Sequence, residues 1–310
     1  MGQSVKLVRK TGFSGHPGQG MQGILPLNKS NDMETVKLNN GIEMPVLGLG
    51  TFLLTDPDTC ERSISEAIRI GYRLIDTAQG YGNEEYIGRA VAGSDVAREE
   101  LFITTKVWFK NYEHTRASVE ESMRKLQTDY LDLVLLHWPF GNTYAAWREL
   151  EELYAAGRIR AIGVSNYTSD RLIDLILYNK VVPAVNQIET NLISQQTEIY
   201  RWMKKYRIQH EGYAPFGQGK IDALYDDPVL MYIADRYHKT VRQVVLRFQI
   251  QSGVVVIPKT MHPDRLKENF EVFDFGLEAN EMEILRSFDK ATPLIGNPQD
   301  PVTVASSIEW

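Results

Sequence analysis

The chain has 310 residues, of which 43% are hydrophobic and 24% are charged, and its formal net charge is −6. This composition is typical of a globular protein with one large domain or two smaller ones. The mildly acidic balance gives no electrostatic reason to bind nucleic acid or an anionic membrane surface. No apolar run approaches the roughly 18 residues that would span a bilayer. The single cysteine, Cys60, excludes an intramolecular disulfide, so we expect a cytoplasmic protein.

Residues 1–32 differ in composition from the rest of the chain. They are rich in Gly, Ser, Asn and Gln and lack the continuous apolar segment of a signal peptide. We therefore expect residues 1–32 to be a flexible extension, with Met33 as a natural start. Residues 33–310 then form one domain.

A regular pattern begins near residue 36 with a predicted β-hairpin, whose turn is Asn40-Gly41. Eight short apolar runs follow, most of them apolar at almost every position rather than at alternate ones. This pattern is typical of parallel strands that are covered on both faces. The runs span residues 45–51, 73–78, 101–107, 131–138, 159–166, 184–190, 208–215 and 254–260.

Helical patterns separate these runs, because apolar residues recur there at spacings of three and four. The predicted helices span residues 59–72, 115–130, 145–158, 169–180, 227–238, 240–252 and 278–289. Eight strands that alternate with helices predict a single (β/α)8 TIM barrel, with the hairpin before it and a tail loop after it. A doubly wound dinucleotide-binding sheet is the alternative. Its G-x-G-x-x-G signature is incomplete in residues 48–53, where Leu53 replaces the third glycine.

Polar or ionisable side chains lie near the ends of successive predicted strands. In a TIM barrel these ends meet on one face, where the chemistry takes place. Each residue alone has an ordinary explanation, such as a helix cap for the aspartate or a solvated surface position for a lysine. Their recurrence at the same end indicates a functional site. They are Asp76, Lys106, His137, Ser165, Asn166, Gln187, Tyr213 and Lys259.

Tyr81 follows Asp76 by five residues and lies between two glycines. A free tyrosine has a pKa of about 10 and is a weak acid at neutral pH, but a nearby cation lowers that pKa. Lys106 could supply this cation, and Asp76 could hold the ammonium in place. His137 could orient a substrate oxygen. The four residues together predict general-acid chemistry directed at an oxygen, as in carbonyl reduction.

These four residues resemble the Asp, Tyr, Lys and His tetrad of the aldo-keto reductases. The resemblance covers about residues 36–310 and is closest to the subgroup of diketogluconate reductases and prostaglandin F synthases. The segments that carry it are "GIEMPVLGLGTF", "GYRLIDTAQGYGNEEYIG", "LFITTKVW", "DYLDLVLLHWP", "IRAIGVSN", "VNQIE" and "IPKT…DRLKEN".

The resemblance implies direct hydride transfer from NADPH to the carbonyl of a small molecule, with Tyr81 as the proton donor. It also implies that Lys106 and Asp76 tune the phenol and that His137 positions the carbonyl. It requires no metal, and the other histidines are scattered along the chain. The family is commonly monomeric, so we expect a monomer.

The resemblance places the nicotinamide end of the cofactor on residues from three successive strands and the following loop. Ser165, Asn166 and Gln187 would bind the carboxamide, and Tyr213 would stack on the ring. The loop of residues 214–219, which contains Phe216, would cover the pyrophosphate.

The same resemblance places the adenosine end on a later segment. Lys259, Thr260 and Arg265 would bind the ribose 2′-phosphate, which favours NADPH over NADH. Glu268 and Asn269 would contact the adenine. A solvated helix N-terminus is the alternative explanation of these residues.

The substrate pocket is implied to contain Phe52, Trp108 and Trp138, and Gly50, Thr51 and Phe52 would line the first loop. The tail of residues 297–310 would shape substrate choice. Ala214 departs from the serine that is common in the family, and residues 190–196 and 220–228 also depart from its pattern.

Two other functional classes stay open on the sequence. A nucleotide sensor or scaffold on the same barrel would bind the cofactor without turnover. A glycosidase would use two carboxylates, with Asp76 and Glu189 as the pair.

Overall fold

The computed structural model describes residues 33–310, so the predicted extension of residues 1–32 lies outside the described part. Eight parallel strands form one sheet in the order β10-β9-β8-β7-β6-β5-β4-β3. The Val256 amide donates to the Val46 carbonyl at 2.9 Å and the Gly50 amide to that of Pro258 at 3.1 Å, which closes the sheet into a barrel. The strands are β3 (Gly48–Gly50), β4 (Leu74–Asp76), β5 (Phe102–Val107), β6 (Leu131–Leu136), β7 (Ile159–Ser165), β8 (Val185–Glu189), β9 (Gln209–Tyr213) and β10 (Val255–Val256).

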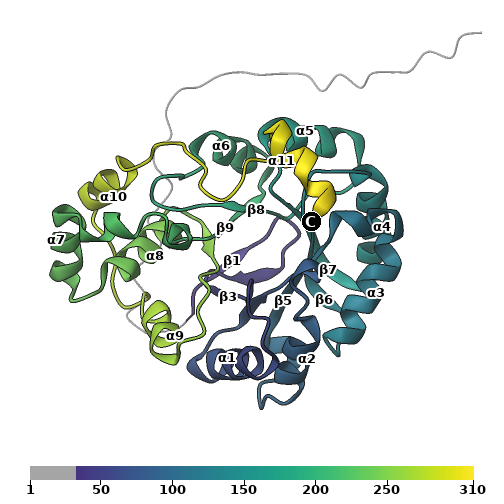
Figure 1. Ribbon diagram of the computed structural model, residues 1–310, viewed down its shortest axis with the longest axis horizontal. Helices are drawn as coiled ribbons and strands as arrows, with labels where there is room; N and C mark the ends of the chain where they lie inside the picture. The colour runs from purple at the N-terminus through teal and green to yellow at the C-terminus, as the bar shows by residue number, and fades with distance from the viewer. Residues whose placement is uncertain (1–32) are drawn as a thin grey trace, which may run out of the picture.

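Helices surround this barrel, as Figure 1 shows, and the predicted TIM barrel is confirmed. The first begins at Pro57, two residues before the predicted start, because the Asp56 side chain accepts the Thr59 amide and Pro57 occupies the first turn. The helices are α1 (Pro57–Ile70), α2 (Glu84–Ala92), α3 (Thr115–Lys125), α4 (Thr143–Ala155), α5 (Ser169–Tyr178), α6 (Thr197–Tyr206), α7 (Pro228–Tyr237), α8 (Val241–Gln251), α9 (Pro263–Phe270), α10 (Ala279–Arg286) and α11 (Pro301–Ser306).

The predicted hairpin consists of β1 (Thr35–Lys37) and β2 (Glu43–Pro45), which pair antiparallel. Its Leu38 and Met44 belong to the same buried apolar cluster as Leu74, Phe102 and other residues of the barrel strands. The hairpin therefore closes the barrel at the end opposite the site. A larger apolar cluster includes residues of both the strands and the surrounding helices.

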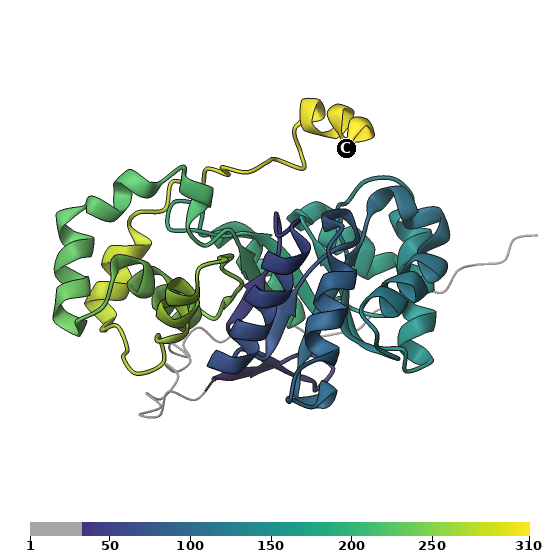
Figure 2. The same cartoon turned by 60° about the horizontal axis from the view of Figure 1, so that its bottom comes forward.

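Two features of the chain differ from the sequence-based expectations. The segments α2, α6 and α9 are helical, although their patterns did not predict helices. The expected tail loop of residues 297–310 contains α11, which Figure 2 shows standing off from the barrel body. None of the helices within residues 33–310 is long and apolar enough to cross a membrane. The expected monomeric state stays a prediction.

Candidate active site

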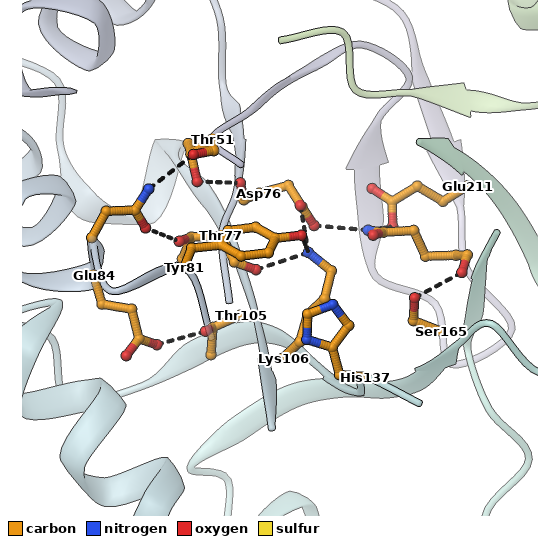
Figure 3. A network of polar contacts seen from close by, with 12 residues as sticks. Thr51, Asp76, Thr77, Tyr81, Glu84, Thr105, Lys106, His137, Ser165 and Glu211 are labelled. Atoms are coloured by element: carbon orange, nitrogen blue, oxygen red, sulfur yellow. Dashed lines mark hydrogen bonds and ion pairs between the residues drawn. The ribbon is translucent and has the colours of Figure 1, made fainter. Parts of the chain in front are cut away.

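Asp76, Tyr81, Lys106 and His137 gather at one end of the barrel, as Figure 3 shows. The Lys106 ammonium donates to Asp76 Oδ1 at 2.5 Å and to the Thr77 carbonyl at 2.9 Å. It lies 3.5 Å from the Tyr81 hydroxyl. The rings of Tyr81 and His137 are 5.7 Å apart at their centroids and meet edge to face. The structure therefore brings all four predicted residues together.

The parallel register explains why these residues meet. Gly50 of β3 is level with Asp76 of β4, and Lys106 of β5 is level with Leu135 of β6. His137 follows the last residue of β6 directly. A side chain on Gly50 would place its Cβ 2.7 Å from the carbonyl oxygen of Ile257, so glycine permits the barrel to close at this point.

The loop that carries Tyr81 is fixed by Asn83, a residue that the sequence analysis did not select. Asn83 is fully buried, and its amide donates to the carbonyls of Thr51 and Leu54 at 2.9 and 3.2 Å. Its oxygen accepts the Thr77 hydroxyl at 2.7 Å. Gly82, with φ of 68°, supplies the left-handed turn between Tyr81 and Asn83. The phenol is thus held by a network within the protein.

Gln79 performs a similar role for Trp108. Its side-chain oxygen accepts the Trp108 amide at 3.0 Å, and its nitrogen donates to the Ser118 carbonyl at 3.0 Å. Polar residues near a tyrosine are a weak signal, so the sequence offered little to select Gln79 or Asn83.

Burial dominates the electrostatics of the site. Burial raises the pKa of Tyr81 above its usual value of 10.0, although the nearby Lys106 charge opposes this change. The expected net lowering of this pKa is therefore wrong, because removal of the phenol from water outweighs the cation. The hydroxyl stays protonated at neutral pH and is available as an acid.

Lys106 and His137 are also fixed in one protonation state. Burial alone would lower the pKa of the Lys106 ammonium, but the neighbouring acidic groups and the hydrogen bond to Asp76 together outweigh burial and raise that pKa, with the Asp76 charge as the largest of these contributions. Burial, reinforced by Lys106, lowers the pKa of His137 well below 6.5. The site therefore combines a charged ammonium, a neutral phenol and a neutral imidazole.

The residues predicted to bind the nicotinamide lie beside this tetrad. The Gln187 side-chain nitrogen donates to Asp76 Oδ2 at 2.8 Å, and the Ser165 hydroxyl donates to the main-chain carbonyl of Gln187 at 2.9 Å. The Asn166 amide donates to the His137 carbonyl at 3.0 Å, and the Tyr213 hydroxyl donates to Asn166 Oδ1 at 2.8 Å. These contacts hold the polar groups of Ser165, Asn166, Gln187 and Tyr213 in fixed orientations.

One cavity of about 700 Å³ lies beside Asn166 and Tyr213 at α5 and α6. Another, of about 600 Å³, is lined by the Asp76, Tyr81 and His137 members of the tetrad. The second extends from Tyr81 past Tyr213 to Lys259, which are three of the predicted residues. Its other lining residues from the prediction are Gly50, Thr51, Phe52, Asp76, Trp108, His137, Trp138, Ser165, Asn166, Gln187 and Phe216.

The adenosine-end residues other than Lys259 do not line that cavity. Thr260 accepts the His262 amide at 3.1 Å, and the Thr240 hydroxyl donates to the Glu268 carboxylate at 2.6 Å. Arg265, Glu268 and Asn269 lie on α9. Neither Lys259 nor Arg265 takes part in an ion pair within the described residues, so both cations are available to an anion. This donor set fits the phosphate of a phosphorylated dinucleotide.

Aromatic side chains form the wall of the cavity beside the tetrad. The Trp108 ring is 5.2 Å from that of His137, and the Phe52 ring is 5.1 Å from that of Tyr81. Trp138 stacks near His137 at 6.2 Å and meets Trp310 of the tail at 5.3 Å. The tail thus reaches the predicted substrate pocket.

Glu189 has another role than the one a glycosidase would need. Its carboxylate accepts the Leu294 amide at 2.7 Å and the Ile295 amide at 2.9 Å, and it also accepts the Asn191 side chain at 3.0 Å. It anchors the C-terminal tail and is not paired with Asp76 across an open site. The glycosidase alternative therefore loses Glu189 as the partner of Asp76.

The aldo/keto reductase family model matches residues 46–290. The chain belongs to the aldo/keto reductase family. This membership confirms the predicted family and enzyme class, the NADPH-dependent aldo-keto reductases.

Several aldo-keto reductases are similar over nearly their whole length. The chain is 44% identical to the glyoxal reductase of Bacillus subtilis over 270 residues, which cover 86% of this chain and 97% of the relative. It is 40% identical to the methylglyoxal reductase DkgA of Escherichia coli, with 85% and 96% covered.

Solved structures of aldo-keto reductases agree with the fold. An enzyme from a deep-sea metagenome library has a TM-score of 0.83 and 40% identity, over 86% of this chain and 98% of that one. A Bombyx mori aldo-keto reductase in complex with NADP has a TM-score of 0.81 and 32% identity, over 86% and 95%.

Proposed function

We propose that this protein reduces aldehydes, small 2-oxoaldehydes among them, to alcohols with NADPH and with Tyr81 as the proton donor. The observation that carries the proposal is the buried contact of Lys106 with Asp76 at 2.5 Å, with the Tyr81 hydroxyl 3.5 Å from the same ammonium. The relatives named glyoxal reductase and methylglyoxal reductase support the substrate class.

The acid step follows from the protonation states of the residues. NADPH, when bound, supplies the hydride for the carbonyl carbon. Tyr81 donates its proton to the carbonyl oxygen, and the resulting phenolate is stabilised by the Lys106 ammonium. Asp76 keeps that ammonium charged and oriented. Because the pKa of His137 is low, its neutral imidazole can orient the carbonyl oxygen without repelling Lys106.

The cofactor-binding residues have separate roles in this proposal. Ser165, Asn166 and Gln187 bind the carboxamide, and Tyr213 presents its ring to the nicotinamide. Lys259 and Arg265 bind the 2′-phosphate, with help from the Thr260 hydroxyl. Glu268 and Asn269 contact the adenine.

The substrate side of the cavity is aromatic. Phe52, Trp108 and Trp138 surround the tetrad and exclude water from the carbonyl, which strengthens the electrostatic contribution of Lys106. Phe52 is 45% exposed, so it lies at the rim.

The test is consumption of NADPH in the presence of methylglyoxal or an aromatic aldehyde, with Tyr81→Phe measured in parallel. The parent should consume the cofactor, and Tyr81→Phe should lose about 100-fold or more in kcat while it binds NADPH normally. Equal turnover by the variant would remove Tyr81 from its role. Tight NADPH binding without turnover of any aldehyde by the parent would instead support a nucleotide sensor.

A further inference from the structure

A second acidic residue, Glu211, lies inside the barrel next to the site. It is on β9, its side chain is fully buried, and the strand register places it level with Gln187 of β8. Glu211 and Asp76 are both labelled in Figure 3, and the Gln187 side chain is hydrogen-bonded to each of them. A carboxyl group in this position loses its hydration, so its presence calls for an explanation.

Gln187 links the two carboxyl groups. Its side-chain nitrogen donates to Asp76 Oδ2 at 2.8 Å and to Glu211 Oε2 at 2.9 Å. A primary amide has two N–H donors and one carbonyl acceptor. Asp76 and Glu211 therefore engage both N–H donors of Gln187. Only the Gln187 Oε1 is left to contact a group other than these two residues.

The two acceptors also decide how the amide is oriented. With Asp76 alone, rotation of the terminal amide could still present its second N–H elsewhere. With Glu211 present, a flip would direct Oε1 at the Asp76 carboxylate and would take both N–H donors away from their acceptors in a buried place, which is costly. Glu211 thus removes one of the two ways in which Gln187 could meet a ligand.

We propose that Glu211 is a positioning residue of the hydride-transfer site. By engaging the second N–H of Gln187, it presents only a hydrogen-bond acceptor to the nicotinamide, and so selects the carboxamide orientation in which the amide N–H₂ faces Gln187. This inference rests on the proposed function, because it assumes that Gln187 meets the nicotinamide.

The charge state of Glu211 is compatible with this role. Burial, together with the charge of Asp76, raises the pKa of Glu211 to about 8, although Gln187 and Lys106 oppose the change. At neutral pH the group is mainly a neutral acid, whose Oε2 accepts from Gln187 without adding a second negative charge beside Asp76. Its Oε1 has no hydrogen-bond partner within residues 33–310.

A cycle of cofactor binding tests the inference. NADP⁺ is compared with its 3-acetylpyridine analogue, which keeps the ring carbonyl but lacks the amide N–H₂. Dissociation constants are measured by quenching of protein fluorescence for the parent, Glu211→Met and Glu211→Gln. Methionine is similar in size to glutamate but offers only a weak acceptor, whereas glutamine keeps the carbonyl acceptor.

We expect the parent to bind NADP⁺ about 5- to 10-fold more tightly than the analogue, as one buried hydrogen bond predicts. Glu211→Met should reduce this preference below about 2-fold, and Glu211→Gln should restore it. A general loss of structure would lower the affinity for both ligands equally and leave the preference for NADP⁺ unchanged.

Two results would overturn the inference: no preference in the parent, or the same preference in Glu211→Met as in the parent. If Glu211→Met does not fold, Gln187→Met provides the second test, and a preserved preference there also overturns the inference. Turnover by the parent is measured separately, so failure of the proposed reduction is distinguished from failure of this role for Glu211.

Discussion

Arg247 of α8 and Glu34, which precedes the first strand, form an ion pair of 2.8 Å although 213 residues separate them in the chain. The Arg247 side chain is 1% exposed and that of Glu34 is 11% exposed. The pair attaches the start of the described chain to a helix that packs on the last strand. It lies away from the tetrad, so it contributes to stability and not to chemistry.

Replacement of Glu34 by glutamine should destabilise the fold by about 3 kcal/mol, because it leaves the buried Arg247 guanidinium without a countercharge. Denaturant unfolding with matched m-values measures the change. Glu121→Gln is the control, since its pair with Arg124 is exposed and should be nearly neutral on replacement. A Glu34→Gln protein as stable as the control variant would contradict the structural role.

The joint replacement of Lys259 and Arg265 by methionine should weaken NADPH binding by about 100-fold, because it removes two charged contacts to one phosphate. NADH, which lacks that phosphate, should bind the double variant with an affinity within about 2-fold of its affinity for the parent. Titration of each cofactor gives both values. Lys267→Met is the control on the helix that carries Arg265, with a side chain that is 70% exposed. An equal loss of affinity for both cofactors would argue against a phosphate contact.

The stability difference between Glu211→Gln and the parent should depend on pH. Glu211 has a pKa of about 8 in the fold and about 4.3 when unfolded, so the fold binds its proton more tightly. This contribution to stability is complete below about pH 4.3 and is lost as the pH rises through 8. The glutamine side chain does not ionise, so the Glu211→Gln variant does not lose stability in this way as the pH rises.

Between about pH 5 and pH 8, the free energy of unfolding of Glu211→Gln should therefore rise relative to that of the parent by on the order of 3 kcal/mol. Unfolding curves for both proteins across this range measure the gain. A difference that stays constant with pH would mean that Glu211 is already ionised in the fold.

Replacement of Glu189 by methionine should release the C-terminal tail, because the amides of Leu294 and Ile295 lose their acceptor. Limited proteolysis should then cut within residues 294–310 at least about 10-fold faster, as expected for a segment with a lower local opening energy. KM should rise, since Ile295 and Trp310 line the cavity. Glu283→Met, on α10, removes a surface charge without touching the tail. Equal cleavage of the two variants would show that Glu189 does not hold the segment.

The strands were predictable from sequence because both faces of each are covered, which makes the runs apolar throughout. The missed helices carry weaker signals. The Asn83 side chain precedes α2 but binds Thr51 and Thr77 in place of the helix amides. Gln196 precedes α6 in a left-handed conformation with no capping bond. Prediction of a helix start from its N-cap residue fails where tertiary contacts engage the side chain of that residue.

The site residues also differ in how clearly the sequence indicated them. Asp76, Lys106 and His137 were visible because each follows an apolar run, and Tyr81 because of its unusual glycine setting. Glu211 gave only a faint signal, an acidic residue within a predicted strand, and its partner Gln187 comes 24 residues earlier. The direction of the Tyr81 pKa shift could not be read from residue types, because it depends on how deeply the hydroxyl is buried.

The sequence by itself determined the alternation of strands and helices, the barrel that follows from it, and the polar residues that end the strands. Local patterns encode these because strand period and residue type are properties of neighbours in the chain. Only the tertiary structure decided that Lys106 contacts Asp76, that Gln187 joins Asp76 to Glu211, and that Glu189 holds the tail. Those contacts join residues far apart in the chain, and their strength comes from burial, which exists only after the barrel has closed.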